Sequence, residues 1–233
     1  MTTAPLAPLR PHPRAAIGAL RIAYSDLATI AATLSEEDSW RATHWPGWAV
    51  RDLLLHLLGD AQRGLVALST PGSGPADRDA VSWWQDTPRW PDLEYRNLRA
   101  QRVIASAWGL EGLARTFGDT ARAVVALAAH TAADALVATQ DRVLRADDLV
   151  VTLAVEAAVH HLDLVADLGR PGPRPEPLAL VRRTVDRLRG VPAPAEWPDE
   201  RWTLLATGRV APGGTERRTL GMDVQRLPLL GCG

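Results

Sequence analysis

The segment from Asp147 to Leu168 constrains the fold most, because it is apolar nearly all round when it is wound as an α-helix. The positions that remain share one strip, occupied by Thr152, Glu156, His160, Asp163 and Asp167. Glu156 and His160 are four residues apart, so their side chains lie on one helical face about one turn apart. Such a pair can hold a metal ion or form an exposed contact, and periodicity alone favours the exposed contact.

Helical periodicity recurs along most of the chain, which predicts a mainly α protein. The predicted helices cover residues 14–34, 49–68 and about 93–129, with a break between Gly109 and Gly118 in the last of these. The helix that contains Glu156 begins at the acidic pair Asp147 and Asp148 and ends at Gly169. Residues 131–145 have no clear periodicity and are expected to be irregular.

Proline marks the expected domain boundaries. Residues 1–13 are a Pro-rich flexible leader, and Pro171 to Pro177 is a stiff linker in which alternate residues are proline. The expected division is therefore a helical body over 14–170 and a small C-terminal α+β domain over 177–233. That domain is expected to contain a helix from Leu178 to Leu188, a strand over 202–207, a turn at Pro212 and a return strand over 217–222.

Composition excludes several classes of function. The formal net charge of −1 and the sequence pI near 6.6 argue against a nucleic-acid-binding protein. No window approaches the roughly 18 apolar residues that a membrane-spanning helix needs. The single cysteine, Cys232, excludes an internal disulfide and a cysteine-rich metal site, which favours the cytoplasm. We expect a cytoplasmic monomer or homodimer.

A second polar strip lies on the helix predicted for residues 49–68, and it contains Asp52, His56, Asp60 and Arg63. If this strip faced Glu156 and His160 across a bundle, two imidazoles and one carboxylate would form a three-ligand set. Such a set suits Zn²⁺ and leaves one coordination position open. The Glu-x-x-x-His spacing by itself is a weak signal for such a site.

Two segments resemble conserved motifs of one family. Trp48 to Leu57, preceded by Pro46 and Gly47, resembles the segment "PGW-x-V-x-D-x-x-x-H-L" of the mycothiol-dependent maleylpyruvate isomerase family, which belongs to the DinB-like helical bundles. Residues 156–164 resemble its later segment "E-x-x-x-H-x-x-D-L". Residues 206–209 and 227–231 resemble the C-terminal region of related sequences, and all these motifs occur in the expected order.

The resemblance implies a four-helix bundle in which a divalent metal, usually zinc, is bound by His56, Glu156 and His160. Asp52 and Asp163 either orient an imidazole or serve only helix-start stabilisation and solvation. A C-terminal arginine is implied in binding an acidic substrate. Arg209 is the candidate for this catalytic role, with Arg217 and Arg218 as alternatives.

The function implied is that of a zinc-dependent enzyme that uses a low-molecular-weight thiol, mycothiol, in an isomerase or S-transferase reaction on a small electrophile. Two alternatives stay open: a non-catalytic bundle that binds a metal or small molecule, and a metal hydrolase that needs no thiol. His161 points away from His160 and is interpreted as a packing or surface residue. Cys232 is interpreted as a tail thiol without a catalytic role.

Overall fold

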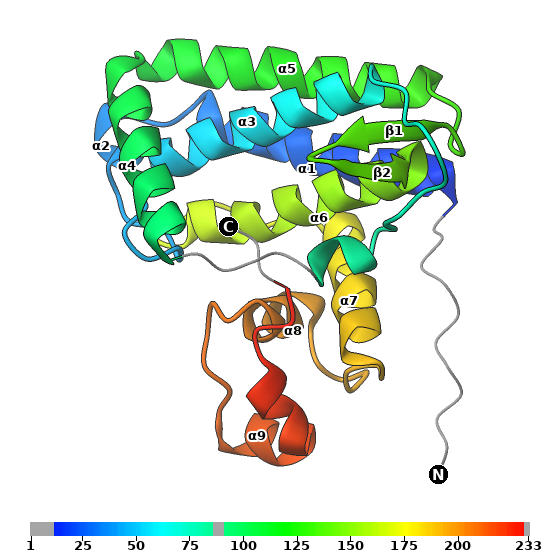
Figure 1. Ribbon diagram of the computed structural model, residues 1–233. Coiled ribbons are helices and arrows are strands. Elements are labelled where there is room, and N and C mark those ends of the chain that lie inside the picture. The colour runs from blue at the N-terminus through cyan, green and yellow to red at the C-terminus, as the bar shows by residue number, and fades with distance from the viewer. Residues whose placement is uncertain (1–11, 86–90, 231–233) are drawn as a thin grey trace.

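The computed structural model describes residues 12–85 and 91–230, and only the backbone for residues 91–97. Four long helices lie alongside one another (Figure 1): α1 (Pro13–Ala31), α3 (Val50–Leu68), α5 (Leu110–His130) and α6 (Ala146–Val165). Helices α1 and α3 each pack against both α5 and α6. This arrangement is a four-helix bundle, so the prediction of a mainly helical protein is confirmed.

Leucine and other apolar side chains of the four helices fill the centre of the bundle. Leu53, Leu57 and Leu153 are essentially inaccessible to solvent, and burying one such side chain stabilises a fold by about 1.5–3 kcal/mol. Phe117 of α5 meets Tyr24 of α1 edge to face, with ring centroids 6.0 Å apart. The break predicted between Gly109 and Gly118 lies at the start of that range. Helix α4 (Pro91–Ala107) ends just before Gly109, which is the N-cap of α5.

Helix α6 is buried on almost every side, including its polar strip. Thr152, His160 and Asp163 are 0% exposed, so the expectation from periodicity that the strip faces solvent is wrong. The reason is that α6 has neighbours all round: α1, α3 and also α7 (Pro175–Arg189) pack against it. A helix that is apolar nearly all round requires such a position, and the polar strip is buried with it.

Residues 131–145, expected to be irregular, contain a hairpin of β1 (Leu136–Thr139) and β2 (Arg142–Arg145). Its two turn residues, Gln140 and Asp141, have φ of 48° and 58°. Both positive angles fit the tight turn that joins antiparallel strands. The turn lacks glycine, and each strand has only four residues, so the sequence carried no usual hairpin signal.

The expected C-terminal strands are wrong, because the structure has helices there. Residues 202–207 lie mostly in α8 (Asp199–Ala206), and residues 217–222 lie in α9 (Gly214–Leu220) and in the 3-10 helix η2 (Gly221–Arg226). Trp202, Leu205 and Ala206 share one helical face and are fully buried. In α9 the carboxylate of Glu216 accepts a hydrogen bond from the Gly213 backbone N–H and caps the first turn.

The remaining elements are short: α2 (Glu36–Ser39) precedes the loop of residues 40–49, which contains Trp40, Trp45 and Trp48, and the 3-10 helix η1 (Ser82–Trp84) precedes α4. The helix expected over 178–188 is confirmed as α7, and Pro175 to Pro177 of the expected linker form its first turn.

The division of the chain into a helical body and a C-terminal domain stays a prediction. The leader up to residue 11 and Cys232 lie outside the described residues. Among the helices described, none combines the length and the apolar character that crossing a membrane requires.

Candidate metal centre

Helices α3 and α6 bring together the three residues expected to bind a metal. His56 comes from α3, and Glu156 and His160 come from consecutive turns of α6. One ligand atom from each residue lies within 4.8 Å of the other two. We call these three residues the His–Glu–His cluster. The side chains of Glu156 and His160 are 13% and 0% exposed, and that of His56 is 22% exposed.

Three atoms of the His–Glu–His cluster are buried without a hydrogen-bond partner among the described residues: His56 Nε2, Glu156 Oε2 and His160 Nε2. The last two lie 3.2 Å apart, but they do not form a well-aligned hydrogen bond. A buried polar atom without a partner costs about 1–3 kcal/mol. A divalent ion would satisfy all three, since Zn²⁺ binds imidazole nitrogen and carboxylate oxygen at about 2.0–2.2 Å. The donor set therefore fits a metal with one open position.

Asp163 fixes the orientation of His160. Its Oδ2 lies 3.0 Å from His160 Nδ1, and both side chains are fully buried. A carboxylate at Nδ1 holds the proton there and turns Nε2 toward the cluster. Arg209 in turn binds Asp163 through Nε at 3.0 Å and Nη2 at 2.8 Å. The backbone carbonyl of Asp163 also accepts a hydrogen bond from the N–H of His44.

The charges at the site shift the pKa of several groups. Burial lowers the pKa of His160, but its contacts with Asp163 and Glu156 outweigh burial and raise it to about 9. Burial raises the pKa of Asp163, whereas His160 and Arg209 bring it down to about 2. For Glu156, burial is opposed by His160, and the pKa falls below its usual value. Burial lowers the pKa of His56, which favours the neutral imidazole that metal binding requires.

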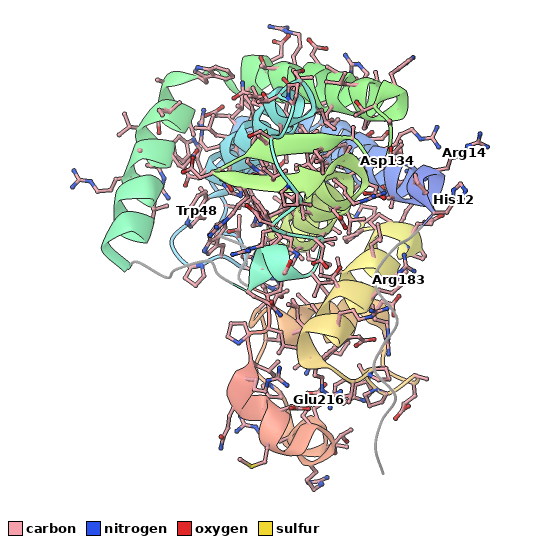
Figure 2. All side chains as sticks on the ribbon, turned by 45° about the vertical axis from the view of Figure 1, so that its right-hand side comes forward. His12, Arg14, Trp48, Asp134, Arg183 and Glu216 are labelled. Atoms are coloured by element: carbon pink, nitrogen blue, oxygen red, sulfur yellow. The ribbon has the colours of Figure 1, made fainter. Side chains whose placement is uncertain are left out.

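Two tryptophans of the loop before α3 form an aromatic wall beside the cluster. The ring of Trp45 stacks on His160, with centroids 5.1 Å apart and an angle of 11° between the planes. The ring of Trp48 stacks on that of Trp45, with centroids 4.2 Å apart, and meets the ring of His56 edge-on. Figure 2 shows Trp48 against the bundle on the side of α4. These rings cover part of both imidazoles and restrict their rotation.

A second polar group adjoins His56 on the same helix. The Oδ2 atom of Asp60 lies 3.7 Å from His56 Nε2, and Arg63 Nε donates a hydrogen bond of 3.3 Å to Asp60 Oδ1. The hydroxyl of Tyr24, from α1, is buried, and the charges of Asp60, Arg63 and Glu156 all act on its pKa. The sequence places Asp60 and Arg63 on the same helical strip as His56. Tyr24 occupies an apolar position of its own helix, so the sequence does not indicate that it lies near the cluster.

The other residues singled out in the sequence serve the fold. Asp52 accepts hydrogen bonds from the Ala49 N–H and from Arg102, so it stabilises the start of α3 and binds α4. His161 is hydrogen-bonded through Nε2 to the carbonyl of Pro171, 3.1 Å away, as its interpretation as a packing residue implies.

The three C-terminal arginines differ in their placement. Arg209 reaches the site through Asp163. Arg217 and Arg218 are exposed on α9, where Arg217 binds the carbonyl of Pro212 and Arg218 binds Thr215. Glu216, labelled in Figure 2, shows that α9 lies beyond the bundle. Of the three, Arg209 is therefore the one that joins the hydrogen-bond network of the His–Glu–His cluster.

Comparison with known proteins identifies one family. The model of the mycothiol maleylpyruvate isomerase N-terminal domain matches residues 20–165, which is more than half of the chain. This range includes the whole His–Glu–His cluster and ends before Arg209. Neither a curated protein nor a solved structure gives a significant match to the chain.

Proposed function

The chain belongs to the mycothiol maleylpyruvate isomerase N-terminal domain family, whose members are DinB-like helical domains, and on this premise we propose that it is a metal-dependent, thiol-using enzyme. The metal we propose is Zn²⁺, bound by His56, Glu156 and His160. The thiol is mycothiol or a close relative, and the second substrate is a small electrophile. The reaction is an isomerisation, as the family's name suggests, or an S-transfer.

One observation carries the metal assignment. Three ligand atoms of the types that Zn²⁺ prefers meet in a buried place, and none of them has a hydrogen-bond partner among the described residues, although His160 Nε2 lies 3.2 Å from Glu156 Oε2. A purely structural cluster would pair these atoms with one another or with neighbouring groups. The Asp163 carboxylate behind His160 supports the same assignment, because histidines that bind metals almost always donate their other N–H to such an acceptor.

The charge of the site favours an anionic ligand at the open position. With His160 neutral, as ligation requires, the carboxylates of Asp60, Glu156 and Asp163 and the guanidiniums of Arg63 and Arg209 leave one negative charge in excess. A divalent ion would change this to one positive charge in excess. A thiolate would neutralise that charge, whereas a neutral ligand would leave it buried and uncompensated.

When bound, a divalent ion would lower the pKa of a thiol at its open position and so supply a thiolate at neutral pH. The described residues contain no cysteine, so none of their side chains offers a thiol, and in this proposal the thiol is a separate molecule. Trp45 and Trp48 exclude water beside the thiolate, which keeps its charge poorly solvated and reactive. Asp163 and Arg209 keep His160 in the orientation that ligation needs. Direct contact of Arg209 with an acidic substrate stays a prediction.

Metal analysis of the purified protein tests the first half of the proposal. We expect one Zn²⁺ per chain in the wild type and its loss in His56→Ala and Glu156→Gln. His161→Gln is the matched control, because it changes a buried histidine on α6 that lies outside the cluster, and we expect it to keep the metal. Stoichiometric zinc that persists in His56→Ala would refute the three-ligand assignment.

Turnover assays test the second half. Zinc-loaded protein is incubated with maleylpyruvate, or with the general electrophile 1-chloro-2,4-dinitrobenzene, in the presence and absence of mycothiol. We expect product only when both zinc and thiol are present. Hydrolysis without thiol would instead identify a metal hydrolase. Zinc binding without turnover of either electrophile would favour a binding protein over an enzyme.

A further inference from the structure

Arg63 is a basic residue near the His–Glu–His cluster with a hydrogen-bond donor left unused. Its Nη1 atom is buried and has no hydrogen-bond partner among the described residues. Its Nε donates to Asp60 Oδ1 at 3.3 Å, and its guanidinium lies over the ring of Trp83, 5.5 Å from the ring centroid. The guanidinium is therefore held in place on two sides while one of its donors stays available.

This free donor belongs to the same polar region as the cluster. The charge of Arg63 lowers the pKa of His56 and of Glu156, and it acts against burial on the pKa of Tyr24. The hydroxyl of Tyr24 is a second buried group without a partner among the described residues. Geometry links Arg63 to the cluster through Asp60, whose Oδ1 accepts from Arg63 Nε at 3.3 Å and whose Oδ2 lies 3.7 Å from His56 Nε2. Arg63 Nη1 is thus an unused donor on a residue that contacts a neighbour of His56.

A buried guanidinium N–H without an acceptor is costly, so a ligand that supplies an acceptor is stabilised there. Arg209 is a poor candidate for this task, because its Nε and Nη2 bind Asp163 and its Nη1 binds the carbonyl of Thr207. Arg217 and Arg218 lie on α9, away from the bundle. Arg63 is the arginine whose available donor lies beside the cluster itself.

We propose that Arg63 binds a carboxylate of the ligand whose other end reaches the metal, and so selects anionic substrates. This proposal rests on the proposed function, because it assumes a metal at the His–Glu–His cluster. It assigns the recognition of an acidic group to α3 in the bundle. Arg209 acts on a different ligand, His160, through Asp163.

Asp60 makes the proposal testable, because replacing Asp60 and replacing Arg63 should change the affinity for an anion in opposite directions. Its carboxylate pairs with Arg63 but would repel a bound anion, and its Oδ2 has no hydrogen-bond partner among the described residues. If Arg63 binds the anion, Asp60→Asn removes the repulsion and tightens anion binding. If Arg63 serves only to hold Asp60 beside His56, then Asp60→Asn and Arg63→Gln have the same effect.

The experiment compares two probes by calorimetry on zinc-loaded protein: succinate, which has two carboxylates, and butyrate, which has one on the same carbon skeleton. In the wild type we expect succinate to bind about tenfold or more tightly than butyrate, as a charge-assisted hydrogen bond implies. Arg63→Gln abolishes this preference and Asp60→Asn increases it. Arg122→Gln, which removes an exposed arginine paired with Asp119 on α5, leaves it unchanged.

Zinc content is measured on every variant, so that the two hypotheses fail separately. Absence of zinc from the wild type defeats the proposed function. A zinc-loaded wild type that does not distinguish succinate from butyrate overturns the role of Arg63, as does an undiminished preference in Arg63→Gln. Arg63→Lys, which keeps the charge with a different donor geometry, is expected to retain part of the preference and replaces the Gln variant if that one does not fold.

Discussion

Arg209 and Asp163 are 46 residues apart in the chain, yet the guanidinium of Arg209 binds both carboxylate oxygens of Asp163, with distances of 3.0 Å and 2.8 Å. Asp163 in turn holds His160, a residue of the His–Glu–His cluster. The segment after α8 therefore supports the candidate metal centre through two consecutive contacts. The geometry makes Arg209 a positioning residue.

Arg209→Gln is expected to weaken zinc binding by about 10–100-fold, because it leaves Asp163 buried without its cationic partner and loosens His160. Competition with a chelator of known affinity measures this change. Arg217→Gln is the control, since Arg217 is exposed and its Nε donates to the backbone carbonyl of Pro212, outside the cluster. Equal zinc affinity in the wild type and Arg209→Gln would show that the contact is structural only.

Zinc binding near pH 7 is expected to release about one proton from His160. The pKa of His160 is about 9 in the metal-free protein, so the imidazole is protonated at pH 7 and must lose a proton before Nε2 can bind a metal. Affinity should therefore rise by about tenfold per pH unit between pH 7 and pH 9. Calorimetry in two buffers with different ionisation enthalpies counts the protons, and binding without proton release would contradict this assignment.

The stability of the metal-free protein is expected to fall at alkaline pH. The pKa of His160 is raised from 6.5 in the unfolded chain to about 9 in the fold. The stabilisation is therefore complete below about pH 6.5 and is lost as the pH rises through 9. Urea unfolding between pH 6 and pH 10 measures the slope.

Two further samples check the origin of that slope. His160→Gln should give a flatter profile over the same range, because it lacks the titrating group. Zinc-loaded wild type should not lose stability between pH 7 and pH 9, because the bound metal replaces the proton.

At acidic pH, Asp163 changes the stability in the opposite direction. Its pKa is lowered from 3.8 to about 2, so its contribution to stability is present above pH 3.8 and is lost as the pH falls through 2.

Two glycines of α3 should respond to alanine in opposite directions. A Cβ at Gly64 would lie 2.7 Å from Leu153 Cδ1 of α6, whereas a Cβ at Gly59 meets nothing within 4 Å. Gly64→Ala is therefore expected to destabilise the bundle by about 1–3 kcal/mol through overpacking. Gly59→Ala should stabilise it by up to about 1 kcal/mol through helix propensity. Thermal or urea unfolding of both variants measures the difference, and equal effects would contradict the close α3–α6 contact.

Much of the bundle could be predicted from local pattern. The helical periodicity located α1, α3, α6 and α7, and the spacing of Glu156 and His160 placed both side chains on one helical face. Local pattern failed where elements are short. The hairpin of β1 and β2 has four-residue strands and a turn without glycine, and α8 and α9 are too brief for their periodicity to outweigh the turn signals around them.

By itself, the sequence determined which residues share a helical face and which of them carry metal-binding atoms. Only the tertiary structure decided that the polar strip of α6 is buried, that His56 of α3 faces it, and that Arg209 binds Asp163. The physical reason is that periodicity reports the direction of a side chain relative to its own helix axis. What lies on the other side of that face depends on how the helices pack, and this sets the burial, the charge and the chemistry of the site.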